Sequence, residues 1–199
     1  MEMFNYIVIS NGRSGSQLCC FLLNEYLHYR LPNVTDFFVD FQKKNTIENY
    51  KENIIYHCHN ENNLLNVPDN FTVIIPHRNI FDLVISNQVA SQLNCHSYSL
   101  ANKNWEENPT PFEITVEDFV NDYKANLRFQ IRLEKLLDKI SNKIVKINYE
   151  DIRDDNNNFF KLMDLDFKLT HPLNFIKSPY DYTKLVTNYD ALNEIKIRI

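Results

Sequence analysis

The length, composition and charge of the chain favour a single globular domain and exclude several other classes of protein. Its 199 residues, 44% of them hydrophobic, are enough to bury a core without support from disulfides or metal ions. The formal net charge of -5 gives no global electrostatic reason to bind nucleic acid or an anionic membrane, so any phosphate site must be local.

Short β-prone runs alternate with longer amphipathic runs along the chain. This alternation predicts βαβ units, and therefore an α/β fold with three α/β/α layers and a central, mostly parallel sheet whose ligands lie at the carboxyl ends of the strands. We expect the segments 33–50 and 92–115 to be loops, and the whole chain, residues 1–199, to form one domain. The expected strands are Tyr6–Ser10, Asn53–His57, Phe71–Ile75 and Ile144–Tyr149, and the expected helices are Ser16–Tyr29, Ile80–Leu93 and Val116–Ile140.

The segment between the first strand and the first helix has the placement and the chemistry of a phosphate-binding loop. Helix N-termini present backbone N–H groups to an anion, glycine allows the backbone to approach closely, and hydroxyl and guanidinium groups add donors. An ordinary Asn-Gly turn before a serine-capped helix is the alternative. The two glycines of the chain both lie in this segment. The candidate binding residues are Gly12, Arg13, Ser14, Gly15, Ser16 and Gln17.

The N-terminal segment and the cysteines favour a reduced protein of the cytoplasm. The chain enters its first β-prone run almost at once, with no basic leader, no small-residue cleavage site and no long apolar span. The cysteines form no C-x-x-C pair, which indicates reduced core thiols rather than metal ligands. We therefore expect a cytoplasmic protein without a membrane anchor; its cysteines are Cys19, Cys20, Cys58 and Cys95.

A second anion-binding motif follows the third expected strand. Arg78 stands at the entrance of the next helix, and Ser86 lies eight residues further along the chain. Two helical turns span a little over seven residues, so both side chains can reach one anion if the first residues of the segment are still loop.

Together, the segments Gly12–Ser16 and Arg78–Ser86 resemble the two motifs with which sulfotransferases bind 3′-phosphoadenosine 5′-phosphosulfate (PAPS). The order and the separation of the two motifs also match. The resemblance implies a P-loop NTPase-like fold and transfer of a sulfuryl group from PAPS, with 3′-phosphoadenosine 5′-phosphate (PAP) as product. It also implies that the loop from Arg13 to Gln17 wraps the 5′-phosphosulfate, whereas Arg78 and Ser86 hold the 3′-phosphate.

The resemblance extends to the end of the chain, with some departures. The segment 145–152 is similar to the late strand of the family and its Tyr-Glu-Asp continuation, for which it implies a mainly structural role. The segment 182–192 is similar to the closing segment of bacterial and carbohydrate-type members, and Lys177, just before it, is a candidate for the 3′-phosphate or else a solvated lysine. Gln17 replaces a hydroxyl residue of the family loop, and the glycine-rich C-terminal loop of the cytosolic members is missing.

Sulfuryl transfer needs a base for the acceptor hydroxyl, and two residues are candidates. His59 follows the second expected strand, where cytosolic members of the family carry a Lys-x-His pair, so His57 would stand at the lysine position; imidazole suits this work near neutral pH. Asp36 lies where carbohydrate- and tyrosine-modifying members place a glutamate base. A strand-end histidine and a helix-capping aspartate are the structural alternatives. Arg13 would stabilise the charge that builds on the leaving oxygen.

The function predicted from the sequence is therefore direct in-line transfer to an acceptor hydroxyl, without a metal ion. The two histidines lack a third ligand in a recognisable motif, which disfavours zinc. The acceptor is a carbohydrate, a peptide tyrosine or a small alcohol or phenol, and the few insertions in the chain favour a large acceptor such as a glycan or a peptide. The alternatives are a P-loop nucleotide or nucleoside kinase, disfavoured because the loop lacks the Walker lysine, and a non-catalytic module that binds PAP or PAPS.

Overall fold

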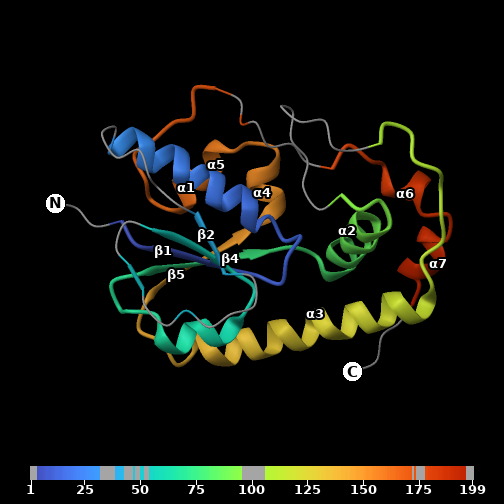
Figure 1. Ribbon diagram of the computed structural model, residues 1–199, viewed down its shortest axis with the longest axis horizontal. Coiled ribbons are helices and arrows are strands. Elements are labelled where there is room, and N and C mark those ends of the chain that lie inside the picture. The colour runs from blue at the N-terminus through green and yellow to red at the C-terminus, as the bar shows by residue number, and fades with distance from the viewer. Residues whose placement is uncertain are drawn as a thin grey trace. The chain divides into compact units, whose positions relative to one another are not determined.

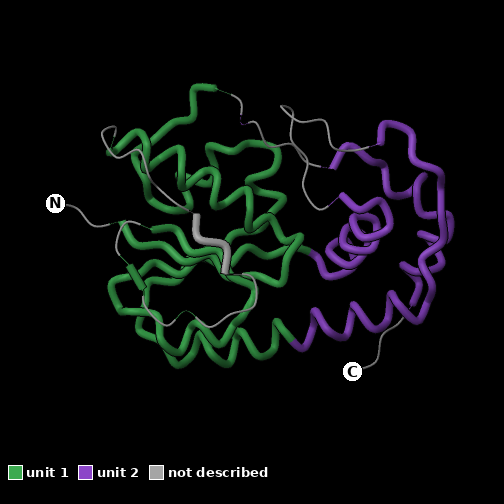
Figure 2. Tube along the Cα trace, viewed as in Figure 1, with its two compact units in different colours: residues 1–78, 129–172 green, residues 79–128, 173–199 purple. Residues whose placement is uncertain are grey.

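The computed structural model forms two compact units, each built from two separate stretches of the chain (Figures 1 and 2). Unit 1 comprises Met1–Arg78 with Phe129–Pro172, and unit 2 comprises Asn79–Arg128 with Leu173–Ile199. That the chain behaves as one domain stays a prediction. The structure describes residues 4–31, 39–42, 47, 50–51, 54–95, 106–171, 173 and 178–195.

A five-stranded parallel sheet forms the centre of unit 1 (Figure 1). The order of its strands is β2-β3-β1-β4-β5, and every neighbouring pair is parallel, which confirms the predicted α/β class and the parallel sheet. The sequence patterns located each strand except β2 to within a few residues. The strands are β1 (Tyr6–Ile9), β2 (Val39–Gln42), β3 (Ile55–Cys58), β4 (Thr72–His77) and β5 (Lys143–Asn148).

The prediction that segment 33–50 is a loop was wrong, because β2 lies within it. β2 has only four residues, Val-Asp-Phe-Gln, and it runs parallel to β3 with Val39 opposite Ile55. Four residues of apolar and polar alternation are too few to separate a strand from a loop by pattern. The pairing with β3, and not the local sequence, defines this strand.

Helices cover both faces of the sheet in unit 1, an arrangement compatible with three α/β/α layers (Figure 1). On one face lie α1 (Ser16–Arg30), α4 (Tyr149–Arg153) and α5 (Asn157–Leu162), of which α1 contacts β1, β3 and β4. The second half of α3 (Val116–Leu137) packs on the opposite face. Because the side chains of a strand alternate between the two faces of the sheet, every second strand residue points into the core between the sheet and α3. It contains Ile7, Ile9, Tyr56, Cys58, Val73 and Ile75 from the strands and Phe129, Leu133 and Leu137 from α3.

Unit 2 is a helical unit with a core of its own. It contains α2 (Ile80–Gln92), the first half of α3, α6 (Tyr182–Leu185) and α7 (Tyr189–Asn193). The side-chain amide of Asn188 bonds to Ile114 in both directions: it accepts from the Ile114 N–H at 3.2 Å and donates to the Ile114 carbonyl at 2.8 Å. The core of unit 2 is apolar and consists of Val84, Ile85, Val89, Ile114, Phe119, Leu185, Val186 and Leu192.

The strand order defines a topological switch point in unit 1. From β1 the chain continues to β2 on one side of the sheet, and from the adjacent strand β4 it continues to β5 on the other side. Where neighbouring strands send their connections in opposite directions, a crevice opens at their carboxyl ends, and open α/β sheets bind ligands there. The segment after β1 and Arg78 after β4 are therefore at the position where a ligand is expected.

None of the helices within the described ranges combines the length and the apolar character needed to cross a bilayer.

His77, the last residue of β4, should make the stability of the fold depend on pH. Burial lowers the pKa of its ring below 6.5, nearby Lys146 lowers it further, and Glu134 opposes them. Because the pKa of His77 is lower in the folded than in the unfolded protein, its contribution to stability is fully present above the pKa of the unfolded state. This contribution is lost as the pH falls through the pKa of the folded state. We expect the urea unfolding free energy of the wild type to drop between about pH 7.5 and about pH 5.5, and that of His77→Asn to drop less.

His28→Asn is the matched control, because His28 is exposed on α1. It should lose stability over this pH range as steeply as the wild type does. An equally steep loss in His77→Asn would show that His77 does not contribute.

Candidate anion-binding site

The turn between β1 and α1 has a backbone shaped to surround an anion. Gly12, Arg13 and Gly15 all have positive φ, at 71°, 45° and 91°. Successive turns of this kind, followed by a helix N-terminus, direct backbone N–H groups to one side and favour a negative charge there. Gly15 is the N-cap residue of α1, no side chain caps this helix end, and its first turn carries no acidic residue. We call residues Gly12–Gln17 the cradle.

The two serines of the cradle are both buried but differ in their bonding. The Ser14 hydroxyl has no hydrogen-bond partner among the described residues. A buried hydroxyl without a partner is costly, and a ligand oxygen is one way to satisfy it. The Ser16 hydroxyl is instead 2.8 Å from Nε2 of His57. Ser14 is therefore the better candidate donor to a bound anion.

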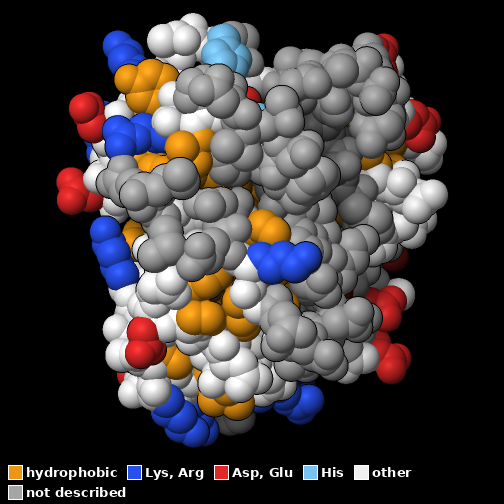
Figure 3. All heavy atoms as spheres, turned by 60° about the vertical axis from the view of Figure 1, so that its left-hand side comes forward, with side chains coloured by type: hydrophobic (Ala, Val, Ile, Leu, Met, Phe, Trp, Pro, Cys, Tyr) orange, Lys and Arg blue, Asp and Glu red, His pale blue; other side chains and the backbone are white. Residues whose placement is uncertain are grey.

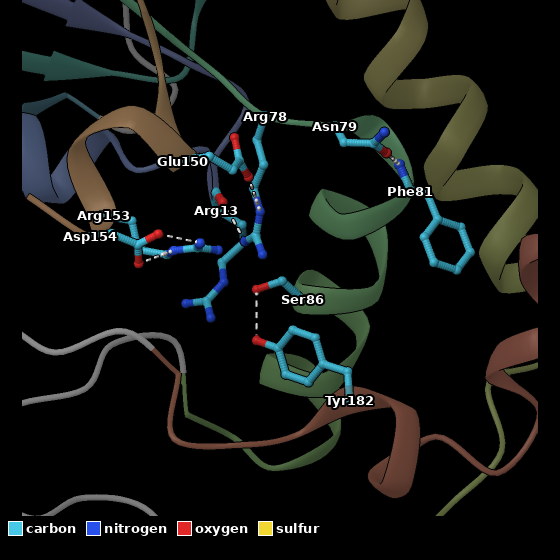
Figure 4. Close-up of polar contacts among 9 residues, drawn as sticks. All are labelled: Arg13, Arg78, Asn79, Phe81, Ser86, Glu150, Arg153, Asp154 and Tyr182. Carbon is cyan, nitrogen blue, oxygen red and sulfur yellow. Dashed lines mark hydrogen bonds and ion pairs between the residues drawn. The ribbon is translucent and has the colours of Figure 1, made fainter.

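The two predicted arginines lie side by side (Figure 4). Arg78 follows β4 directly, and its Nη1 donates to the backbone carbonyl of Arg13 at 3.3 Å. The guanidinium carbon of Arg78 lies 4.9 Å from the centre of the Tyr149 ring, within the range of a cation–π interaction. Its Nε is 3.8 Å from Oε1 of Glu150. The adjacency of β1 and β4 thus gathers two guanidinium groups at the cradle.

Tyr149 explains why the cradle requires glycine at position 15. A Cβ atom placed on Gly15 would overlap the Tyr149 ring, whereas one placed on Gly12 would meet no atom within 4 Å. Tyr149 follows β5, and its ring therefore contacts both the cradle and Arg78. The resemblance implied a mainly structural role for the segment that contains Tyr149 and Glu150. This segment follows the carboxyl end of β5, the strand beside β4. That position was the signal that could have assigned the segment to the site.

His57, within β3, and His59, just after it, lie beside the start of the cradle. Nδ1 of His59 is 2.6 Å from the carbonyl oxygen of Ser10. A carbonyl oxygen can only accept, so Nδ1 donates, and whenever the ring is neutral its one proton is on Nδ1. The lone pair is then on Nε2, which is the arrangement a general base needs. His57 is buried and bonds to Ser16, and its ring centre lies 4.7 Å from that of His59. The structure places His57 as a partner of the cradle hydroxyl.

The structure does not test three of the predicted site residues. Asp36 and Lys177 are outside the described residues. Ser86 belongs to α2 in unit 2, where it is buried and its hydroxyl accepts a hydrogen bond from the Tyr182 hydroxyl at 3.2 Å (Figure 4). That Ser86 and Arg78 share one phosphate, and the choice between His59 and Asp36 as the base, stay predictions.

The buried thiols beside the cradle supply no nucleophile. Burial raises the pKa of Cys19 to about 12 and raises that of Cys20 as well, so both are neutral thiols near pH 7. All four cysteines are buried, as expected of core residues. Within the part of the chain that the structure describes, no group of three or more His, Cys, Asp or Glu could hold a metal ion.

The positive charge of the site is local. On the face shown in Figure 3, the basic and acidic side chains of the described residues are interspersed among apolar ones. Arg153, which follows Glu150 in α4, donates to Asp154 through both Nε, at 2.8 Å, and Nη2, at 2.6 Å, and so is already neutralised. Arg13 belongs to the cradle itself, and Arg78 is joined to it by the hydrogen bond to the Arg13 carbonyl.

Comparison with known families and with curated proteins gave no match to this chain.

Substitution of the two glycines should have unequal effects on stability. Both have positive φ, so an alanine at either position carries backbone strain of about 1–2 kcal/mol. Gly15→Ala also overlaps the Tyr149 ring, which adds about 1–3 kcal/mol of overpacking. We expect urea denaturation to show a clearly larger loss for Gly15→Ala than for its matched control Gly12→Ala. Equal losses would mean that Tyr149 does not fill the space beside Gly15.

Proposed function

We propose that this protein is a PAPS-dependent sulfotransferase that transfers a sulfuryl group to an acceptor hydroxyl. The observation that carries the proposal is the junction of Arg78 with the cradle: its Nη1 bonds to the Arg13 carbonyl at the switch point between β1 and β4. PAPS carries phosphate at both ends of its ribose, so its site needs two separate groups of anion donors. The cradle and Arg78 come from different strands and supply such groups.

The cradle would bind the 5′-phosphosulfate. Its backbone N–H groups, the Ser14 hydroxyl and the Arg13 guanidinium are donors suited to phosphate and sulfate oxygens. In the reaction, the acceptor oxygen forms a bond to sulfur while the bond from sulfur to the bridging phosphate oxygen breaks. Negative charge then builds on the bridging oxygen as PAP leaves, and cationic and N–H donors at the cradle stabilise that charge.

His59 would remove the proton of the acceptor hydroxyl. Its Nε2 lone pair takes the proton, and its Nδ1–H bond to the Ser10 carbonyl holds the ring in place as it becomes charged. The base lies beside the turn that leads into the cradle, because Ser10 directly follows β1. Asp36 is the alternative base.

A nucleotide kinase is the main competing function. The cradle has the glycines and the hydroxyl groups of a phosphate loop but no lysine between Gly15 and Ser16, where a Walker motif has one. Without that lysine, the β- and γ-phosphates of ATP lose their principal cation. Stronger binding of ATP with magnesium than of PAP would favour this alternative.

Arg78→Ala should weaken the binding of PAP selectively. In calorimetry we expect the wild type to prefer PAP to AMP, because only PAP has a 3′-phosphate. Loss of a charged hydrogen-bond donor should weaken PAP binding by about 10- to 100-fold and leave AMP binding within about threefold.

Arg153→Ala is the matched control, because Arg153 is an arginine of the same unit whose partner is Asp154. It should bind PAP as the wild type does. Equal affinity of the wild type for PAP and AMP would remove the assignment of Arg78 to the 3′-phosphate.

His59→Ala should abolish transfer while it leaves nucleotide binding nearly intact. General bases contribute about 10²- to 10⁴-fold to rate, so the formation of PAP from PAPS should fall by that factor. The acceptors to be assayed are sugars, phenols and tyrosine peptides, and PAP affinity is measured in parallel.

His171→Ala, at an exposed histidine of unit 1, is the control and should retain full activity. If the His59→Ala protein remains active, Asp36 and not His59 is the base. A wild type that binds PAP tightly but modifies no acceptor would instead indicate a binding module without catalysis.

A further inference from the structure

The Arg78 guanidinium has a carboxylate beside it that takes no part in the proposed reaction. Nε of Arg78 lies 3.8 Å from Oε1 of Glu150, close enough for attraction between the charges but too far for a hydrogen bond. Nε itself is buried and has no hydrogen-bond partner among the described residues. Glu150 therefore offsets the charge of Arg78 without satisfying its donor.

Other contacts confine the guanidinium to this position. Its guanidinium carbon lies over the Tyr149 ring. Its Nη1 is bonded to the Arg13 carbonyl (Figure 4). The Arg78 side chain is 14% exposed, whereas that of Glu150 is 43% exposed. A phosphate that approaches Arg78 thus meets a fixed cation and a carboxylate that can turn away into water.

We propose that Glu150 is the internal counter-ion of Arg78 and competes with the 3′-phosphate, so that it limits the preference of the protein for PAP over AMP. This inference rests on the proposed function, because it takes the 3′-phosphate as the ligand of Arg78. Two anions that share one cation repel each other, and the carboxylate must give up its ion pair when the phosphate binds. The result is a lower affinity for PAP, which is also the product that has to dissociate after each turnover.

Glu150→Gln tests the inference because it removes the charge and keeps the shape of the side chain. We expect PAP to bind about three- to tenfold more tightly to E150Q, and AMP to bind within about twofold of the wild type. Asp151→Asn is the matched control: it removes one negative charge from the next residue, whose carboxylate is bonded to Asn148 at 3.1 Å. Its PAP affinity should stay within about twofold of the wild type.

The gain should also depend on Arg78. In an Arg78→Ala background, Glu150→Gln should change PAP affinity by less than about twofold, because the cation for which the two anions compete is gone. Weaker PAP binding by E150Q would show that Glu150 orients Arg78 rather than competes for it, and would overturn the inference. An equal gain in PAP affinity in Asp151→Asn would show that the effect comes from net charge alone, and would overturn the inference as well.

Inorganic pyrophosphate separates this inference from the proposed function. If the wild type binds PAP no better than AMP, the assignment of the 3′-phosphate fails, and pyrophosphate becomes the probe. A gain in pyrophosphate affinity in E150Q that disappears in the Arg78→Ala background would support Glu150 as a competitor at an anion site. No gain in pyrophosphate affinity would overturn the inference together with the proposed function.

Discussion

The candidate site depends on the pairing of two neighbouring strands, β1 and β4. Their parallel register, with Val8 opposite Ile74, brings their carboxyl ends to the same edge of the sheet. The two segments that leave this edge carry the cradle and Arg78, and the hydrogen bond from Arg78 to the Arg13 carbonyl joins them. The charged groups are thus positioned by main-chain hydrogen bonds in a buried sheet. Such a frame costs little reorganisation when an anion binds, which is the condition for electrostatic stabilisation.

The sequence predicted those parts of the fold that local patterns determine. Continuous apolar runs marked the buried strands, periodic apolar residues marked α1 and α2 to within a residue or two, and the two glycines marked the turn after β1. β2 was missed because four residues carry too little periodicity, and the pairing with β3 that defines it is not local. Likewise the sequence named His59 as one candidate base beside Asp36, but only the Ser10 carbonyl beside His59 indicates which of its nitrogens donates.

Contacts between distant parts of the chain account for the rest of the candidate site. Nothing near position 15 in the sequence shows that the Tyr149 ring fills the space beside it, or that Glu150 faces Arg78. The same holds for the bond between His57 and Ser16. Motifs specify donors along the chain, whereas the groups that restrain those donors come from other strands and helices.

The interleaving of the two units also constrains how the chain folds during synthesis. Unit 1 lacks β5 until the ribosome has passed residue 148, although its first four strands are made long before, and residues 79–128 emerge in between. Unit 2 in turn waits for α6 and α7, whose residues Leu185 and Leu192 complete its core. Neither unit can therefore close before most of the chain exists. Nascent chains of this kind expose apolar strand edges for longer, and they are the ones that chaperones shield.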